Sequence, residues 1–272
     1  MPHPRSDAVR AGLAARGLHW PAPIEHLETV TSTNDRLKES ARAGAAEWTV
    51  VLAERQSAGR GRAGHRWVSP PGNLYLSVLL RPAVPAATAA VLPLAAGVAV
   101  AEAVSELGVE TRLKWPNDVV AGDRKLGGIL VEGLSAVAGL EAAIVGVGLN
   151  LSLDPAALAD DLRGRATSVR AETGRPMTVA EAAVAVLARL TVWYDALARE
   201  GTAGVLAAWR ERSVPWWGRV VEARSGGTAL RGIARGLDER GGLVLDLDDG
   251  SRVTVVSGEV NELRLAASAS RP

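Results

Sequence analysis

The spacing of apolar and polar residues changes along the chain and divides it into two parts. Up to about residue 212, short apolar runs alternate with longer stretches in which apolar residues recur at helical spacing. Beyond this point, short β-rich runs alternate with glycine turns at 226–227, 241–242 and 250. We therefore predict an α+β chain: a mixed-sheet domain, then a small antiparallel barrel or sandwich of about fifty residues. The predicted boundary lies near Ser213.

Helices are predicted where a capping residue precedes an apolar stripe and a glycine follows it. The strongest case is residues 178–200, with Thr178 as the cap and Gly201 as the stop. The other predicted helices are at most one short amphipathic helix before residue 30, residues 31–44 with Ser32 or Thr33 as the cap, an alanine-rich helix ending near Leu107, and residues 203–212.

Strands are predicted where β-branched and apolar residues form short runs. These runs cover residues 48–54, 73–81, 110–115, 125–132 and 141–151. The most apolar stretch of the chain, roughly 83–104, is interrupted by Pro85, Pro93 and Glu102. It therefore reads as a buried helix of a folded domain rather than as a membrane span.

Composition narrows the classes of function. The 272 residues include no cysteine, which excludes disulfides and thiolate zinc sites and fits a reducing compartment. The formal net charge is +1, so no overall field draws the protein to DNA or to a membrane. The first residues lack the apolar core of a secretory signal. We expect a cytoplasmic protein.

Residues 55–67 read RQSAGRGRAGHRW, and Gly59, Gly61 and Gly64 match the G-x-G-x-x-G spacing of a dinucleotide-binding turn. Such a turn follows a strand and opens a helix, but here a pair of prolines, a Gly-Asn turn and a second strand-like run follow. The stretch is therefore a glycine-rich loop between two strands. Its four arginines suit a phosphate or carboxylate, and a solvated basic loop is the open alternative.

Three further clusters carry candidate chemistry, and each has a plain structural alternative. TSTN (31–34) offers polar side chains at a helix start, where one of them would suffice as a cap. In 113–133, Lys114 could neutralise developing phosphate charge and Asp118 could hold Mg²⁺, although a surface ion pair would also explain them. GVGLN (146–150) places an amide where it could bind a purine edge or end a strand.

Together, in this order, these clusters resemble the catalytic domain of the biotin–protein ligase family. The matching segments are TSTN, ERQSAGRGRAGHRWVSPPGNLYLSV, LKWPNDV, RKLGGILVE and GVGLN. The resemblance implies a biotin/lipoate ligase-type domain at 27–212, a short segment at 1–26 and an SH3-like domain at 213–272. It also implies a reaction: biotin attacks ATP to form biotinyl-AMP, and a lysine of a biotin carboxyl carrier protein then takes the biotinyl group.

The resemblance assigns roles to individual residues. Lys125, Lys114, Arg62 and Asp118 are the expected catalytic residues, and Asp118 is also the expected Mg²⁺ ligand. Biotin is expected to bind Ser32, Thr33, Asn34, Gln56, Gly59, Arg60, Gly61, Arg62, Lys125 and Gly128. The nucleotide is expected to bind Arg60, Arg62, His65, Arg66, Trp67, Lys114, Asn117 and Asn150, with the Trp67 ring stacked near the adenine.

The chain also departs from the family pattern. The family's loop often carries more arginine than this one, which contains Ala63 and His65, and Gly127 stands where alanine is frequent. Only about thirty residues precede TSTN, fewer than the winged helix-turn-helix of bifunctional relatives, so we expect no DNA binding. We expect a monomer or a weak homodimer. The alternatives are a lipoate or octanoate ligase and a non-catalytic biotin sensor, although both candidate lysines are present.

Overall fold

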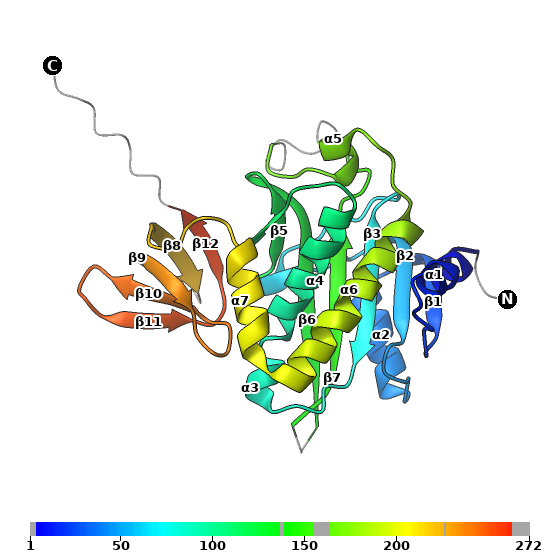
Figure 1. Ribbon diagram of the computed structural model, residues 1–272, viewed down its shortest axis with the longest axis horizontal. Helices are drawn as coiled ribbons and strands as arrows, with labels where there is room; N and C mark the ends of the chain where they lie inside the picture. The colour runs from blue at the N-terminus through cyan, green and yellow to red at the C-terminus, as the bar shows by residue number, and fades with distance from the viewer. Residues whose placement is uncertain (1–3, 137–138, 155–163, 226, 263–272) are drawn as a thin grey trace.

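A computed structural model describes residues 4–136, 139–154, 164–225 and 227–262. Figure 1 shows a large sheet with helices packed against it, and a smaller sheet beside it that the end of the chain forms. The two sheets confirm the α+β class predicted from the sequence, with its mixed-sheet domain and antiparallel tail. The boundary near Ser213 stays a prediction; the last helix of the first part ends at Arg212, and the next strand begins at Val220.

The large sheet has seven strands in the order β1-β2-β3-β7-β6-β5-β4. Only the β1–β2 pair is parallel among these neighbours, so the sheet is mixed. The strands are β1 (Ile24–Val30), β2 (Val50–Gln56), β3 (Leu74–Leu80), β4 (Arg112–Lys114), β5 (Asp118–Ala121), β6 (Arg124–Ala136) and β7 (Gly139–Leu149).

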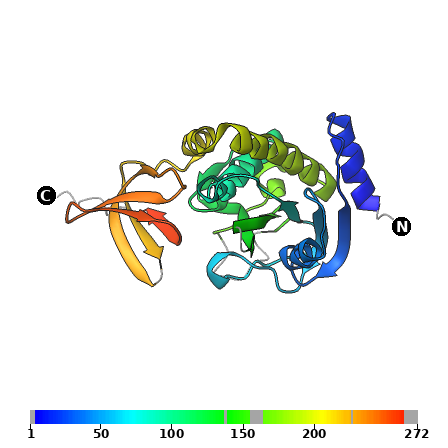
Figure 2. The same cartoon turned by 90° about the horizontal axis from the view of Figure 1, so that it is seen from below.

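Alternate residues of the central strands point to opposite faces of the sheet. Both faces carry buried apolar side chains, so helices cover both. Helices α4 and α6 lie on one face, against a core that includes Val50, Leu52 and Val145. Helix α2 lies on the other face, where Leu37 packs with Val51 (Figure 2). The helices are α1 (Pro4–Ala15), α2 (Thr33–Arg42), α3 (Ala86–Ala89), α4 (Leu92–Glu106), α5 (Val169–Thr173), α6 (Val179–Glu200) and α7 (Thr202–Arg212), with a 3₁₀ turn η1 at Arg62–Gly64.

The predicted helices are present, and the helix predicted at 178–200 has the expected cap. Thr178 accepts a hydrogen bond from the backbone N–H of Glu181, whose side chain bonds back to Thr178. Gly201 follows the helix with a positive φ of 78°, an angle that favours glycine. The stretch Ala86–Glu106 is apolar and long enough to cross a membrane, but 67% of its most apolar window is buried inside the protein. It is a core helix, as its prolines and Glu102 indicated.

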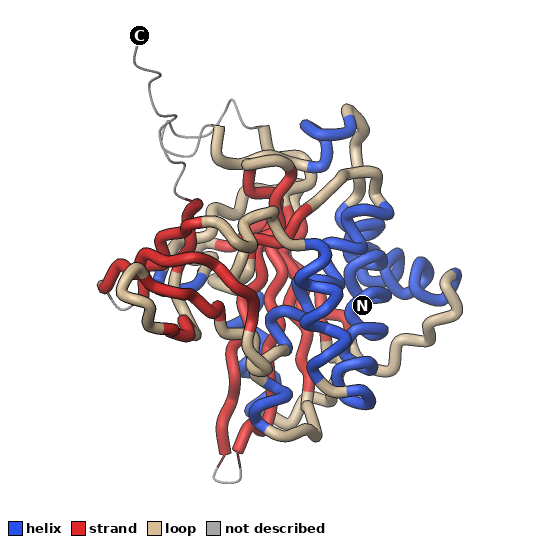
Figure 3. The backbone as a smooth tube through the Cα atoms, turned by 60° about the vertical axis from the view of Figure 1, so that its left-hand side comes forward, coloured by secondary structure: helices blue, strands red, loops and turns tan. Residues whose placement is uncertain are grey.

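The second sheet has five antiparallel strands in the order β11-β10-β9-β8-β12, as the alternating tail predicted. They are β8 (Val220–Ser225), β9 (Thr228–Leu237), β10 (Leu243–Leu247), β11 (Arg252–Val255) and β12 (Glu259–Glu262). Figure 3 shows this sheet on one side of the long strands and the helices on the other. The indole N–H of Trp115 donates to the carbonyl of Gly241 at 3.0 Å, which fastens the small sheet to the β4–β5 turn.

Two strands were not predicted. β1 is an edge strand whose sequence, IEHLETV, mixes charged and apolar residues, and it is buried at only alternate positions near its start. β5 has four residues and forms a hairpin with β4. The turn at Trp115–Asn117 joins the two strands and ends the strand predicted at 110–115. Short and edge strands carry the weakest apolar signal, because little of their surface is buried.

Candidate active site

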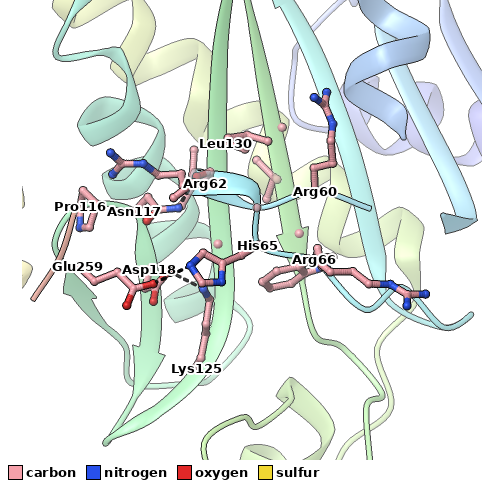
Figure 4. Close-up of a pocket in the computed structure, with 18 of the residues that line it drawn as sticks. Arg60, Arg62, His65, Arg66, Pro116, Asn117, Asp118, Lys125, Leu130 and Glu259 are labelled. Atoms are coloured by element: carbon pink, nitrogen blue, oxygen red, sulfur yellow. Dashed lines mark hydrogen bonds and ion pairs between the residues drawn. The ribbon is translucent and has the colours of Figure 1, made fainter. Parts of the chain in front are cut away.

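A cavity of about 770 Å³ opens between the large sheet, the glycine-arginine loop and the small sheet (Figure 4). It brings together side chains from all four clusters that the sequence indicated. The predicted site residues that line it are Ser32, Thr33, Asn34, Gln56, Arg60, Gly61, Arg62, His65, Arg66, Trp67, Lys114, Asn117, Asp118, Lys125, Gly128 and Asn150. Gly59 is a predicted site residue outside this lining; a Cβ there would lie 2.5 Å from the carbonyl oxygen of Trp67.

The polar end of the cavity lies at the start of α2. Ser32 occupies the N-cap position with extended backbone angles, but its side chain makes no capping hydrogen bond. Thr33 instead donates from its backbone N–H and its hydroxyl to Oε1 of Gln56, at 2.9 and 3.2 Å. Ser77, fully buried on β3, lies 2.8 Å from Thr33 Oγ1 and 2.6 Å from Asn34 Oδ1. A plain helix cap therefore does not account for this cluster.

Glycines of β7 make room for the side chains around the cavity. A Cβ on Gly146 would overlap the amide of Asn34, and a Cβ on Gly148 would lie 2.6 Å from the Trp67 ring. The Trp67 ring thus lies against bare backbone, with the ammonium of Lys125 5.4 Å from its centroid. The strand GVGLN needs its glycines for this close approach, a reason that the sequence pattern alone did not supply.

The cationic end of the cavity contains Lys125, Arg62 and Lys114. Lys125 at the start of β6 forms an ion pair with Asp118 at the start of β5, with Nζ 2.6 Å from Oδ1. Burial lowers the pKa of the Arg62 guanidinium, and the negative charge of Asp118 partly offsets this by raising it. Arg62 remains a cation, because an arginine does not lose its proton in proteins. A half-buried cation beside an open cavity is suited to bind an anion.

The glycine-arginine loop is a small folded ribbon between β2 and β3. The backbone N–H of Gly61 donates to the carbonyl of His65 at 2.7 Å, and that of Trp67 donates to Gly59 at 2.9 Å. Ala63 at the tip has φ 50°, a left-handed angle that favours glycine. The next regular element after η1 is strand β3, not a helix, which confirms the rejection of a dinucleotide-binding turn.

The side chains of the loop point in different directions. Figure 4 shows Arg60 and Arg66 directed away from the Lys125–Asp118 pair, whereas Arg62 extends toward Asn117. The guanidinium of Arg60 is already paired with two carboxylates, Asp35 at 2.5 Å and Glu132 at 3.0 Å. The contacts of these three arginines with a ligand stay predictions. The ion pairs of Arg60 also give that residue a structural role.

Two amides that we expect to bind the nucleotide also hold the site together. Asn150 donates from Nδ2 to the carbonyl of Thr167 at 3.0 Å, and Asn117 donates to the carbonyl of Ile129 at 2.7 Å. A third amide was missed by the sequence analysis. Asn73 is buried at the start of β3, and its Oδ1 accepts backbone N–H groups from residues 151–153 at 2.9 to 3.2 Å. The Gly-Asn pair at the predicted turn thus also holds the segment after Asn150 in place.

The small sheet contributes residues to the cavity that the sequence analysis did not predict. They are Arg224, Gly227, Ser257, Gly258, Glu259 and Val260. Glu259 lies 3.1 Å from Nε2 of His65, so the tip of the loop touches the second sheet. These residues are scattered in a region of ordinary composition, and only the packing of the two sheets shows that they reach the site.

No group of three or more His, Cys, Asp or Glu side chains that could hold a metal ion occurs within the described ranges. Asp118 lines the cavity as a single carboxylate that is paired with Lys125. A single carboxylate fits Mg²⁺ that binds together with a nucleotide. Most of the ligands of such a Mg²⁺ ion come from phosphates and water, and one or two come from protein carboxylates. A resident metal held by protein side chains alone does not fit these residues.

Comparisons with known proteins agree with this geometry. Residues 27–150 match the biotin/lipoate A/B protein ligase family, and residues 217–261 match the biotin protein ligase C-terminal domain. The chain is 35% identical over 265 residues to a biotin–[acetyl-CoA-carboxylase] ligase of Mycobacterium tuberculosis, covering 94% of this chain and 95% of that protein. A protein of the same name from Paracoccus denitrificans is 36% identical over 224 residues, 80% of this chain and 92% of that protein.

A solved structure extends the likeness to three dimensions. The biotin protein ligase of Aquifex aeolicus in complex with biotin and ATP superposes with a TM-score of 0.75 at 30% identity, covering 89% of this chain and 99% of that one. Sequence and fold therefore agree across both sheets, and the chain belongs to the biotin protein ligases of the biotin/lipoate A/B protein ligase family.

Proposed function

We propose that this protein activates biotin with ATP as biotinyl-AMP and then transfers the biotinyl group to a lysine of a biotin carboxyl carrier protein. The observation that carries the proposal is one cavity that joins a neutral polar end to a cationic end. The polar end contains Thr33 and Gln56, and the cationic end contains Arg62 and Lys125. A substrate with a neutral polar head and a carboxylate tail matches that arrangement.

The polar end suits the ureido ring of biotin, which presents two N–H donors and one carbonyl acceptor. The hydroxyls and amides of the TSTN cluster and Gln56 can both donate and accept hydrogen bonds. Lipoate and octanoate end in a dithiolane ring or a methyl group and offer no such partners. They would leave buried polar groups unpaired, which costs roughly 1–3 kcal/mol for each group. This argument favours biotin over the fatty acyl alternatives.

The cationic end suits the first chemical step. A carboxylate oxygen of biotin attacks the α-phosphorus of ATP, the bond to the β-phosphate oxygen breaks, and pyrophosphate leaves with the electron pair. Like charges repel as the carboxylate approaches the polyphosphate. Lys125, Arg62 and Lys114 would offset this repulsion with charges that the fold already holds in place.

Mg²⁺ bound to the polyphosphate would neutralise further negative charge, and Asp118 is the side chain that we propose to hold it. In the structure, Asp118 is paired with Lys125. We propose that Lys125 turns from this carboxylate toward the biotin carboxylate when substrates enter, because both groups lie at the same end of the cavity.

In the second step the neutral amine of the carrier lysine attacks the acyl carbon of biotinyl-AMP, AMP leaves with the bonding electrons, and the nitrogen loses one proton to solvent. The amide that forms is the C–N bond of biotinylated protein. We propose that the reaction takes place in the cytoplasm. We also propose that the enzyme is a monomer or weak homodimer and does not bind DNA. The formal net charge of +1 and the absence of cysteine support this setting.

Transfer to a carrier tests the proposal. Purified protein is incubated with ATP, biotin and a biotin carboxyl carrier domain, and the modified lysine is mapped by mass spectrometry. A carrier with that lysine changed to arginine is the matched control. Biotin on the carrier lysine and none on the control supports the proposal. An unmodified carrier in the presence of ATP and biotin contradicts it, and an adenylate that forms but is never transferred would favour a sensor.

A further inference from the structure

Glu132 on β6 lies directly behind the cavity without lining it. Its carboxylate accepts a hydrogen bond from Asn34 Nδ2 at 2.7 Å and pairs with Lys38 Nζ at 2.6 Å and Arg60 Nη2 at 3.0 Å. Two of these partners line the cavity, Asn34 at the polar end and Arg60 on the loop. One carboxylate therefore joins helix α2 to the loop.

The contact between Glu132 and Arg60 holds the start of the glycine-arginine loop in place. Asp35 holds the same guanidinium nitrogen at 2.5 Å, so α2 and β6 both bind the residue that follows Gly59. Beyond this point the loop turns through the small ribbon that carries Arg62 into the cavity. An anchor at Arg60 restricts where Arg62 can lie.

The contact with Asn34 continues into the polar end of the cavity. Asn34 is buried, its Oδ1 lies 2.6 Å from Ser77 Oγ, and Ser77 Oγ lies 2.8 Å from Thr33 Oγ1. A continuous path of polar groups within hydrogen-bond distance of one another thus runs from Thr33 through Ser77, Asn34 and Glu132 to Arg60. Linked polar groups of this kind stabilise one another when each is satisfied.

The partners of Glu132 keep its carboxyl group deprotonated. Burial raises the pKa of the Glu132 carboxyl, but hydrogen bonds from Lys38 and Asn34 outweigh it and hold that pKa below its usual range. The side chain is 20% exposed, so its ion pairs are shielded from most of the solvent. At neutral pH it is a carboxylate that faces two cations.

We propose that Glu132 is a positioning residue: it anchors the glycine-arginine loop to the polar end of the cavity so that biotin and its adenylate meet a loop that is already partly ordered. The inference rests on the proposed function. Ordering a mobile loop opposes binding, and an anchor present before the ligand arrives reduces that cost. Glu132 thereby acts on binding and retention, whereas Lys125 acts on the chemistry.

The kinetic test uses Glu132→Gln, which removes the charge and keeps the shape. We expect the KM for biotin to rise and the release of biotinyl-AMP to quicken by about tenfold, the scale of one lost charge-assisted hydrogen bond. The single-turnover rate of adenylation at saturating biotin should stay within about threefold, because the groups that face the phosphates are unchanged. Glu141→Gln is the control, since Glu141 pairs with Arg81 on the same sheet outside the cavity lining and should leave every value unchanged.

A double-mutant cycle separates anchoring from direct contact with the ligand. If Glu132 acts through Arg60, Arg60→Gln in the Glu132→Gln background adds less than about twofold to the KM for biotin. Fully additive effects, or a Glu132→Gln protein with the wild-type KM and release rate, would overturn the proposal. Glu132→Asp keeps the charge with a shorter reach, should give an intermediate KM, and replaces Glu132→Gln in the cycle if that variant does not fold.

Trypsin cleavage of the ligand-free protein tests the anchor without any catalysis. We expect cleavage after Arg62 and Arg66 to be about tenfold faster in Glu132→Gln than in the wild type or Glu141→Gln, because the loop opens more often. Equal cleavage rates would contradict the anchor even in an active enzyme. A protein that shows this difference but does not adenylate biotin would instead contradict the proposed function alone.

Discussion

Lys125 and Asp118 face each other at the starts of adjacent strands, with Nζ 2.6 Å from Oδ1. The pairing of β5 with β6 sets this distance, because Asp118 lies opposite Gly128 and Val120 lies opposite Lys125 across a bulge. The backbone of Lys125 is also held on its other side, where its N–H donates to the carbonyl of Arg165 at 2.7 Å. The ammonium is thus placed at the cavity by three segments of the chain.

Replacing Lys125 by alanine should leave the fold intact and slow adenylate formation by at least about 100-fold, the usual scale for one charge-stabilising group. Pyrophosphate release in a single turnover measures the rate, and circular dichroism checks the fold. Arg124→Ala is the control, because Arg124 is the next residue on β6 and pairs with Glu172 outside the cavity lining. A folded Lys125→Ala protein with near-normal adenylation would show that the role is misassigned.

Arg62→Gly should still form biotinyl-AMP but release it about tenfold or more faster, since a charge-assisted contact is worth roughly 1.5–3 kcal/mol. Free adenylate acylates exposed lysines, so biotin on a bystander such as albumin measures the leak. Ala63→Gly is the matched control: it adds a glycine at a position with φ 50° but removes no charge. Unlabelled albumin beside normal adenylate formation would mean that Arg62 does not retain the intermediate.

Biotin should order residues 59–66 and thereby help to form the ATP site. Glycine resists ordering, and a bound anion would add a partner of opposite charge for Arg62. If trypsin cuts only the ligand-free loop, biotin at 100 times its Kd slows cleavage after Arg62 by up to about 100-fold. Cleavage of the same sample in the presence of ATP alone provides the comparison. The same rate with and without biotin would argue against binding in the order biotin, then ATP.

Asn73→Ala should lower the free energy of unfolding by at least about 2 kcal/mol, because it leaves buried backbone N–H groups without an acceptor. Its Oδ1 accepts from residues 151–153, and the side chain is about 1% exposed. Urea unfolding measures the change, with the exposed Ser57→Ala as a control within about 0.5 kcal/mol of the wild type. A stable Asn73→Ala protein would show that this segment holds its position without the amide.

Stability should fall in acid, in part through Glu132. Its pKa is held below the usual range in the folded protein, so the unfolded chain takes up the proton first. The stabilisation is complete above the unfolded-state pKa, about 4.3 for glutamate, and is lost as the pH falls through the lower folded-state pKa. Urea midpoints between pH 7 and pH 3 should therefore decline less steeply in Glu132→Gln. Parallel pH profiles for the two proteins would contradict this.

The sequence predicted the parts of this protein that depend on local pattern. The capped helix at 179–200 and the β-rich tail both follow from spacing and turn residues. All the predicted site residues except Gly59 line one cavity, because motif residues tend to lie at strand ends and loops, where the fold brings them together.

Other features depend on contacts between segments far apart in the chain. Glu132 is one charged residue in a strand. Only its distances to Asn34 and Arg60 reveal that it links helix α2 to the glycine-arginine loop. Glu259 reaches the loop because the two sheets pack together, and Gly146 is needed because Asn34 lies against it. No local pattern encodes these pairings.

Pyrophosphate–ATP exchange tests the central claim most directly, because it reports adenylate formation before any carrier protein is involved. Purified protein is given labelled pyrophosphate, ATP and either biotin, lipoate or octanoate. We predict exchange that requires biotin and exceeds that with either fatty acid by at least about 100-fold, since the polar end of the cavity rejects a substrate without hydrogen-bonding groups. Exchange without biotin, or equal exchange with lipoate or octanoate, would contradict the account.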